Sequence, residues 1–334
     1  FEVNRYEYAV ERTSLIAKLE GTGGRKAICF GGHTDVVPLG DKPWSVKPFG
    51  ADIVDGRLYG RGSCDMKSGV AAYVHMGLKL AHEQRGVADI VVVMAAGEET
   101  GCDGSKHLKE LGVLPDAGAM IIAEPTSNYP ILGHRGALWL NATVRGTTVH
   151  GSMPELGDNA VYKAARAIIN LENFGFNVTP NALLGNTTLN VGTFHGGINI
   201  NSVPDKAIFT IDIRTIPGHM HDEIVATLAR YLGDEVELER LADVVPVLMA
   251  TDDDWVMEVF DLVEERLGER PQPRGAPYFT DASALTAACS YPPTIILGPG
   301  DMALAHQTDE YCDVAMIEKA AEIYDAITRR WCEL

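Results

Sequence analysis

The chain has 334 residues, of which 46% are hydrophobic and 22% are charged, a balance typical of a globular protein with about two domains. Its formal net charge is −18 and no basic patch offsets it, so we expect neither nucleic acid nor an anionic membrane as a partner. No apolar run is long enough to span a membrane, and the first residues lack the basic and apolar segments of a signal peptide. Because the chain does not begin with methionine, removal of a leader stays an alternative.

Six cysteines are scattered along the sequence without a CxxC pair, which argues against a zinc finger or a thioredoxin-like redox site. Small buried thiols in a reducing compartment are the simpler interpretation, so we expect a cytoplasmic protein.

The first 135 residues alternate strand-like and helix-like segments. Three continuous apolar runs predict strands buried on both faces, as in a parallel or mixed sheet: residues 26–32, 88–97 and 117–125. Residues 67–84 have the apolar spacing of a helix. Strand-like and helix-like segments alternate again near the C-terminus. Helices are predicted there at residues 252–267 and 315–334, and a strand at residues 292–300.

The middle of the chain has a different pattern of apolar and polar residues. Residues 137–146 alternate apolar and polar side chains, as a half-exposed antiparallel strand does. A helix, two strands, a second helix and a last strand are predicted after it: residues 158–173, 187–197, 205–214, 221–233 and 234–241. This β-α-β-β-α-β order is the ferredoxin-like pattern. We therefore expect an α/β domain, residues 1–136 and 248–334, interrupted by a ferredoxin-like α+β insertion, residues 137–247.

Histidines and carboxylates follow the predicted strands of the α/β domain. They are His33 after the first run, Glu98 and Glu99 after the second, Glu124 after the third and His306 in the loop after the last strand. Asp65 lies at the start of the 67–84 helix. Because ligands bind beyond the carboxyl ends of strands in open α/β sheets, we expect these groups to converge on one edge of the sheet.

Each of these residues also has an ordinary structural explanation. Asp65 is a possible N-cap, His33 a satisfied core imidazole, and the two glutamates a solvated loop. So many histidines and carboxylates after separate strands are harder to explain as ordinary polar loop residues. Imidazole and carboxylate groups are ligands that favour metal ions. Five ligands are one too many for a single catalytic zinc, but they suit two ions that share a bridging carboxylate and hold a hydroxide between them. Of the two neighbouring glutamates, one would then bind metal and the other would take the proton from water.

Asp35 lies two residues after His33 and is the candidate partner for the other ring nitrogen of that histidine.

Five motifs together resemble the M20 metallopeptidase family, most closely its branch of acetylornithine deacetylases and succinyl-diaminopimelate desuccinylases. They are GGHTDVVP (31–38), GRGSCDMKSG (60–69), GEET (97–100), AEPT (123–126) and AHQTDEY (305–311). The resemblance runs from about residue 10 to the C-terminus. It departs from the family before that point, where a further helix and strand normally precede RTSLIAKLEG.

The resemblance implies two zinc ions, for which cobalt or manganese can substitute. One zinc would bind His33 and Glu124, the other Glu99 and His306, with Asp65 as the bridge and Glu98 as the general base. The implied fold is a zinc-peptidase-like mixed sheet flanked by helices, with an inserted domain that forms a homodimer and acts as a lid.

The insertion carries further matches. The resemblance implies that His150 reaches the active site of the partner subunit and stabilises the oxyanion there. It also implies that Asn201 and Arg214 bind the substrate carboxylate, a task that suits the planar fork of arginine. Arg135 and the backbone at Gly298 are weaker candidates for substrate binding, and a structural ion pair is an equal alternative for Arg135.

The run GPGDMALAHQTDEY resembles acetylornithine deacetylase more than the desuccinylase. We therefore expect a hydrolase that removes the acyl group from an N-acyl-L-amino acid, with acetylornithine as the first substrate to test. A desuccinylase, or a dipeptidase or carboxypeptidase with the same metal core, is the alternative. A metal-binding protein without catalysis is disfavoured because Glu98 and His150 are both present, and a Rossmann-type nucleotide site is disfavoured because GRGSCD is not GxGxxG.

Overall fold

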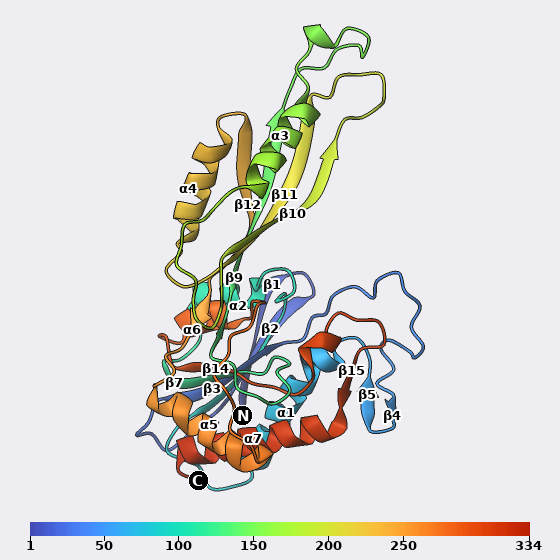
Figure 1. Cartoon of the computed structure of the whole chain (residues 1–334). Coiled ribbons are helices and arrows are strands. Elements are labelled where there is room, and N and C mark those ends of the chain that lie inside the picture. Colours follow the sequence, from blue (N-terminus) through green and yellow to red (C-terminus); the bar gives the residue numbers. More distant parts are fainter. The chain divides into compact units, whose positions relative to one another are not determined.

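The computed structural model describes all residues from 1 to 334, and the chain divides into two compact units. The larger unit comprises Phe1–His134 and Val247–Leu334, and the inserted unit comprises Arg135–Pro246 (Figure 1). None of the helices combines the length and the apolar character that a membrane crossing requires.

A six-stranded mixed sheet forms the centre of the larger unit. Its strands, in spatial order, are β1 (Glu2–Ala9), β2 (Arg12–Leu19), β6 (Ile90–Ala95), β3 (Ala27–His33), β7 (Ala117–Ile122) and β14 (Thr294–Ile296). Strands β6, β3, β7 and β14 are parallel, whereas β1 and β2 are antiparallel to their neighbours. The inner strands are continuously apolar because helices cover both of their faces.

Two glycines of β3 show how these helices are distributed. A Cβ atom at Gly31 would meet Leu285 of α6 (Ala282–Ala288), whereas one at the next residue, Gly32, would meet Val70 of α1 (Ser68–Leu80). Successive strand residues point to opposite faces, so α6 and α1 lie on opposite sides of the sheet. Both glycines therefore permit close packing of a helix on the central strand.

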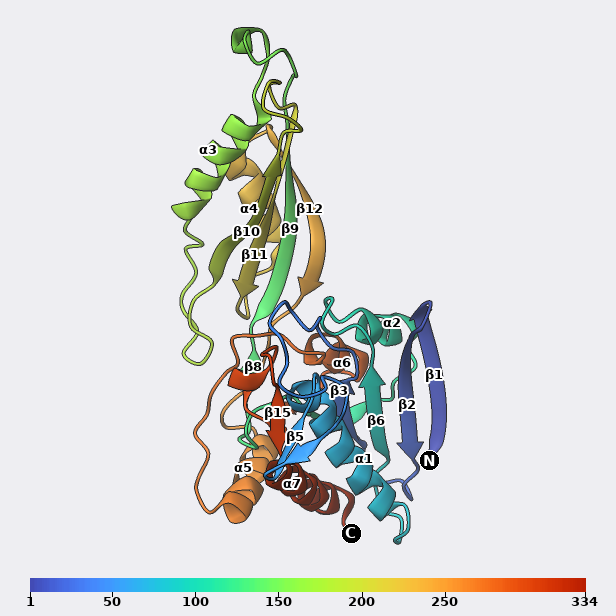
Figure 2. The ribbon, with the colours of Figure 1, turned by 90° about the vertical axis from the view of Figure 1, so that its right-hand side faces the viewer.

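The remaining helices follow the same division. Helix α7 (Val314–Cys332) packs against α1, and α5 (Asp254–Leu267) packs against α7 (Figure 2). On the opposite face, α2 (Asp103–Leu111) packs against α6. The ring of Phe30 in β3 packs at a tilt against Tyr73 of α1 and edge to face against Tyr324 of α7, with ring centroids 6.0 and 5.4 Å away. Aromatic packing therefore joins the central strand to two helices.

Short elements complete the larger unit. Strands β4 (Ile53–Val54), β5 (Arg57–Tyr59) and β15 (Tyr311–Asp313) form a small sheet, and β8 (Gly133–His134) pairs with β13 (Val247–Leu248). Two helical turns, Ser63–Lys67 and Met302–Leu304, lie in the loops that carry candidate site residues.

The inserted unit is a four-stranded antiparallel sheet with two helices. The elements follow the chain as β9 (Gly136–Arg145), α3 (Ala160–Glu172), β10 (Thr188–Gly196), β11 (Lys206–Thr215), α4 (His221–Leu232) and β12 (Val236–Val244), after a helical turn at Pro154–Leu156. The strand order β10-β11-β9-β12 is the ferredoxin-like order. Alternate residues of β9 and β11, such as Leu138, Phe209 and Ile213, are buried against the helices.

The α/β fold class and the mixed sheet are therefore confirmed, but several elements were not predicted from the sequence. Strands β1 and β2 extend the sheet before residue 20, and β1 was missed because it is an edge strand with few buried side chains. Helices α2 and α6 are short, and the three strands of the small sheet have two or three residues each, too few for a periodic pattern. The predicted helix at residues 67–84 is shorter and ends at Leu80.

Candidate metal centre

The larger unit brings six titratable side chains together at one edge of its sheet. His33 is the last residue of β3, Glu98 and Glu99 follow β6, and Glu124 follows β7. Because β6, β3 and β7 are parallel, the carboxyl ends of these strands meet at the same edge. Asp65 joins them from the helical turn before α1, and His306 from the loop after Met302–Leu304.

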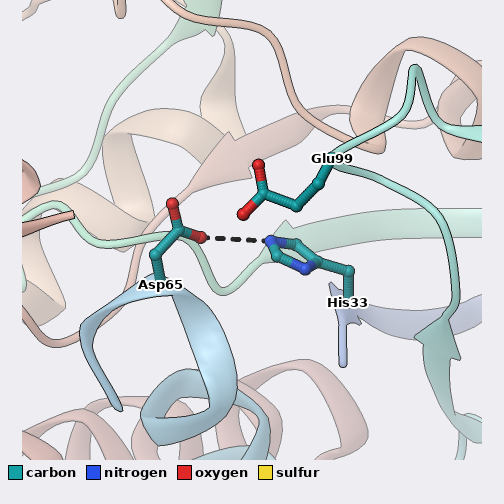
Figure 3. A group of neighbouring side chains, drawn as sticks. All are labelled: His33, Asp65 and Glu99. Carbon is teal, nitrogen blue, oxygen red and sulfur yellow. Dashed lines mark hydrogen bonds and ion pairs between the residues drawn. The ribbon is translucent and has the colours of Figure 1, made fainter. Parts of the chain in front are cut away.

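Asp65 lies between the two histidines. Its Oδ1 atom is 3.1 Å from Nε2 of His33, and its Oδ2 atom is 3.4 Å from Nε2 of His306. Figure 3 shows the Asp65 carboxylate directed at the His33 ring, with Glu99 beside them. The two oxygens of one carboxylate thus face two different imidazoles.

The other carboxylates divide between the two histidines. Glu99 Oε1 lies 3.2 Å from His306 Nε2, whereas Glu98 and Glu124 each have an oxygen 3.9 Å from His33 Nε2. Candidate ligand atoms of His33, Asp65 and Glu99 lie within 4.8 Å of one another.

Burial and mutual charge strongly perturb these groups. Burial raises the pKa of Glu98 and of Glu124 well above the usual value, and neighbouring carboxylates raise both further. Hydrogen bonds to Asp65 and Glu99 raise the pKa of His306 to about 10. For His33, burial lowers the pKa, but hydrogen bonds with Asp35 and Asp65 and the nearby glutamates outweigh it, so the pKa is raised well above its usual value.

The donor set suits divalent cations. Two imidazoles and four carboxyl groups lie together here, and the raised pKa values of Glu98 and Glu124 mean that a negative charge on either is costly without a cation beside it. Imidazole and carboxylate are the ligands that zinc, cobalt and manganese accept. A buried carboxylate cluster of this kind is costly to ionise unless cations occupy it, so these residues fit a metal centre.

Asp35 connects His33 to the loop that carries the two glutamates. His33 Nδ1 lies 3.1 Å from the backbone oxygen of Asp35 and 3.5 Å from its Oδ1 atom. The same carboxylate accepts hydrogen bonds from the backbone N–H groups of Gly97, Glu98 and Glu99, at 2.8, 3.2 and 3.2 Å. Asp35 thereby holds the ring and this loop in a fixed relation, as outer carboxylates do at metal sites.

The ordinary explanations for single residues do not describe this site. No side chain caps α1, whose N-cap residue is Lys67, so Asp65 is not an N-cap. Glu98 is 5% exposed and the side chain of Glu99 is 12% exposed, so they do not form a solvated loop. His33 is buried, but its ring faces carboxylates rather than ordinary core partners.

One buried acid near the centre was not anticipated from the sequence. Asp281 is 1% exposed, and its Oδ1 atom accepts a hydrogen bond of 2.6 Å from Ser105. Burial raises the pKa of Asp281 to about 6, although the charge of His33 lowers it. The stretch YFTDASAL contains this acid, but nothing in its spacing marks it as buried beside the other carboxylates.

The remaining candidates for substrate binding and oxyanion stabilisation lie mostly in the inserted unit. His150 is exposed and lies 2.7 Å from the Ser152 hydroxyl through Nδ1, and the neighbouring Gly151 N–H donates to the carbonyl of Asn201 at 2.7 Å. His150 and Asn201 are thus adjacent within this unit, although they are far apart in sequence.

The two arginines of the inserted unit have partners there. Arg214 pairs with Asp212 at 3.0 Å, and Arg135 Nε donates to the carbonyl of Leu184 at 2.7 Å. In the larger unit, the N–H of Gly298 donates to the hydroxyl of Thr126 at 3.1 Å, so this backbone group is already paired. A role in substrate binding stays a prediction for all three residues.

Comparison with known proteins supports a single family. The model of peptidase family M20/M25/M40 matches residues 29–330. The acetylornithine deacetylase of Myxococcus xanthus is 31% identical over 97% of this chain and 85% of that protein. The acetylornithine deacetylase of Proteus mirabilis is also 31% identical, over 96% of this chain and 82% of that protein.

Solved structures agree on the fold. An M20 family metallo-carboxypeptidase of Sulfolobus solfataricus has a TM-score of 0.79 at 18% identity, covering 96% of this chain and 88% of that one. A Bacillus subtilis protein described as a dinuclear metal-binding peptidase of the M20 family has a TM-score of 0.69 at 15% identity, covering 99% of this chain and 88% of that one. At these identities the likeness concerns the fold alone.

Proposed function

This chain belongs to peptidase family M20/M25/M40 and is a metal-dependent hydrolase of amide bonds, and from that premise we propose that it removes the acyl group from an N-acyl-L-amino acid. The observation that carries the proposal is the arrangement around Asp65, whose two carboxylate oxygens face two different histidines. N-acetylornithine is the first substrate to test, because the relatives at 31% identity are acetylornithine deacetylases. An N-succinyl amino acid or a dipeptide is the alternative substrate.

Two zinc ions are the proposed cofactors, with cobalt or manganese as substitutes. His33 and Glu124 would hold one ion, Glu99 and His306 the other, and Asp65 would bridge them. The pairing of Asp65 Oδ1 with His33 and of Oδ2 with His306 supports this division. When bound, the ions supply a Lewis acid for the scissile carbonyl and lower the pKa of the attacking water.

Glu98 is the proposed general base. Its carboxylate is buried beside His33 but belongs to neither proposed pair of ligands, and burial raises its pKa, which suits a group that accepts a proton. Glu98 would take the proton from the attacking water and deliver it to the amine that leaves. Asp35 supports this role, because it fixes the backbone N–H of Glu98.

The inserted unit is the proposed site of a homodimer, through which His150 would reach the active site of the partner subunit and stabilise the oxyanion. Strand β10 is an edge strand with an unpaired side. The segment at its end carries the exposed apolar residues Phe194, Ile198 and Ile200. An open strand edge beside exposed apolar side chains favours pairing with a second copy. Lid closure by this unit is part of the same proposal.

Asn201 and Arg214 are the proposed ligands of the substrate carboxylate, with Arg135 and Gly298 as weaker candidates. A cytoplasmic location is also proposed, supported by six buried free cysteines, which are typical of a reducing compartment.

The proposal is tested by replacing Glu98 with glutamine, which keeps the size of the side chain but removes its basicity. We expect Glu98→Gln to abolish turnover of N-acetylornithine while the chain still binds two zinc ions. The matched control is the neighbouring Glu99→Gln, which should lose metal as well as activity. If Glu98→Gln loses metal, Glu98 is a ligand instead of the base. If the unaltered zinc-loaded chain cleaves N-succinyl or aminoacyl substrates and not the acetyl compound, the substrate assignment is wrong.

A further inference from the structure

A buried ion pair contacts the loop that carries Asp65. Glu310 is 0% exposed and Arg61 is 5% exposed, and Arg61 Nη1 donates to Glu310 Oε2 at 2.6 Å. The two residues are far apart in sequence, Arg61 in the loop that leads to Asp65 and Glu310 four residues after His306. They do not lie among the proposed metal ligands.

The second oxygen of Glu310 holds the loop that carries Asp65. Oε1 accepts hydrogen bonds from three backbone N–H groups: Gly62 at 3.0 Å, Cys64 at 2.8 Å and Asp65 at 3.1 Å. The backbone oxygen of Glu310 also accepts a hydrogen bond from Gly60 at 2.9 Å. A single residue thus fixes the backbone on both sides of Arg61 up to Asp65 itself.

The guanidinium group of Arg61 reaches two further loops. Its Nη2 atom donates to the carbonyls of Pro38 and His306, both at 3.3 Å, and Nη1 also donates to the carbonyl of Gln307 at 3.2 Å. The segment ending at Pro38 begins at His33. The Arg61–Glu310 pair therefore forms hydrogen bonds with all three loops that present His33, Asp65 and His306.

The chemistry of this pair favours a positioning role over a purely stabilising one. Apolar side chains of similar volume often replace a buried ion pair without loss of stability. Here such a replacement would leave three N–H groups and three carbonyls of functional loops without their partners. A planar fork and a carboxylate are needed to meet all of them at once.

We propose that Arg61 and Glu310 are positioning residues that hold Asp65 and His306 in the relation that lets both bind the same metal ion. The inference rests on the proposed function, in which Asp65 is the bridge and His306 a ligand of one ion. Neither residue of the pair touches metal or substrate. Each acts through the backbone of a ligand, as outer partners do at other metal sites.

The test replaces Glu310 with glutamine in the full chain and measures zinc affinity by titration. A glutamine oxygen can still accept the loop N–H groups, but its amide N–H₂ then faces the guanidinium donors. We expect Glu310→Gln to lower the affinity for one of the two ions by about 10- to 100-fold and to change the visible absorption of the cobalt-loaded chain. Arg61→Lys, which keeps the charge but not the fork, should act in the same direction.

A core variant controls for a general loss of stability. Val263→Ala creates a cavity in α5, at a residue that is 0% exposed and absent from the three loops. It should lower the melting temperature without changing the zinc affinity or the cobalt spectrum. The inference is overturned if Glu310→Gln and Arg61→Lys bind both ions within about twofold of the unaltered chain, or if Val263→Ala loses metal to the same extent. Should Glu310→Gln fail to fold, Arg61→Lys decides the question.

Failure of the proposed function would look different. In that case the unaltered chain would bind fewer than two ions, or Asp65→Asn would leave metal binding unchanged.

Discussion

Removing the metal from the purified chain with a chelator should lower its thermal stability by several degrees. Without cations, the buried carboxylates of the metal centre repel one another. Oxygens of Asp65 and Glu99 lie within 4.8 Å of each other, and the two side chains are 8% and 12% exposed. At an effective dielectric constant of about 20, two unit charges at this separation repel by about 3 kcal/mol.

Protonated His306 outweighs this repulsion, because its ring lies 3.4 Å from Asp65 and 3.2 Å from Glu99, which at the same dielectric constant corresponds to about 5 kcal/mol of attraction to each. The loss of stability on chelation therefore comes from the binding free energy of the metal, which is about 2 kcal/mol for an ion present at about 30 times its dissociation constant. For a unit of this size, about 2 kcal/mol corresponds to a fall in melting temperature of roughly 4–8 °C.

The assay is differential scanning calorimetry of the zinc-loaded chain, the chelated chain and the chelated chain with zinc restored. Elemental analysis of each sample verifies its metal content. Asp65→Asn is the matched variant, because it removes the charge of the proposed bridging ligand, weakens metal binding and should reduce the difference between the loaded and chelated forms. The reasoning is refuted if the chelated chain, shown to be free of metal, melts at the same temperature as the loaded one.

Three further predictions concern the inserted unit. His150→Ala should lower turnover by about 100- to 1,000-fold, and mixing it with Glu98→Gln should restore part of the activity through mixed dimers; no recovery would argue against sharing between subunits. Arg214→Lys should raise KM more than it lowers kcat, because lysine lacks the planar fork, and equal falls in kcat and kcat/KM would contradict a role in carboxylate binding. Leu138→Ala, at a fully buried position, should destabilise this unit by about 2–5 kcal/mol in chemical denaturation while the zinc content stays unchanged. Loss of zinc in that variant would mean that the two units do not unfold independently.

Many strands of the larger unit could be predicted from the local pattern of apolar residues in the sequence. Continuous apolar runs predicted strands β3, β6 and β7, because strands that are covered on both faces need apolar side chains at every position. The polar residues that follow these strands could be placed at one edge of the sheet for the same reason, since the strands are parallel. The five motifs were specific enough to indicate the family, which the family comparison confirmed.

The sequence could not predict which groups meet across long separations. Nothing in the spacing of Arg61 and Glu310 indicates that they form a buried pair, because contacts between distant segments depend on how the loops fold back over the sheet. The same holds for Asp281, whose burial follows from the packing of α6 and α2. A motif shows which side chains are present in one segment. Which distant side chain each of them contacts depends on how the whole chain packs.

Local sequence patterns were thus sufficient to identify the types of residue at the candidate metal centre, the strands that present them and the family of the chain. The packed structure was needed to show that Asp65 directs one oxygen to His33 and the other to His306, and that Asp35 contacts both His33 and the loop of Glu98. Hydrophobic periodicity in a sequence indicates only which face of a helix or strand is buried. The distances among polar groups, by contrast, are set by the packing of all the elements that carry them.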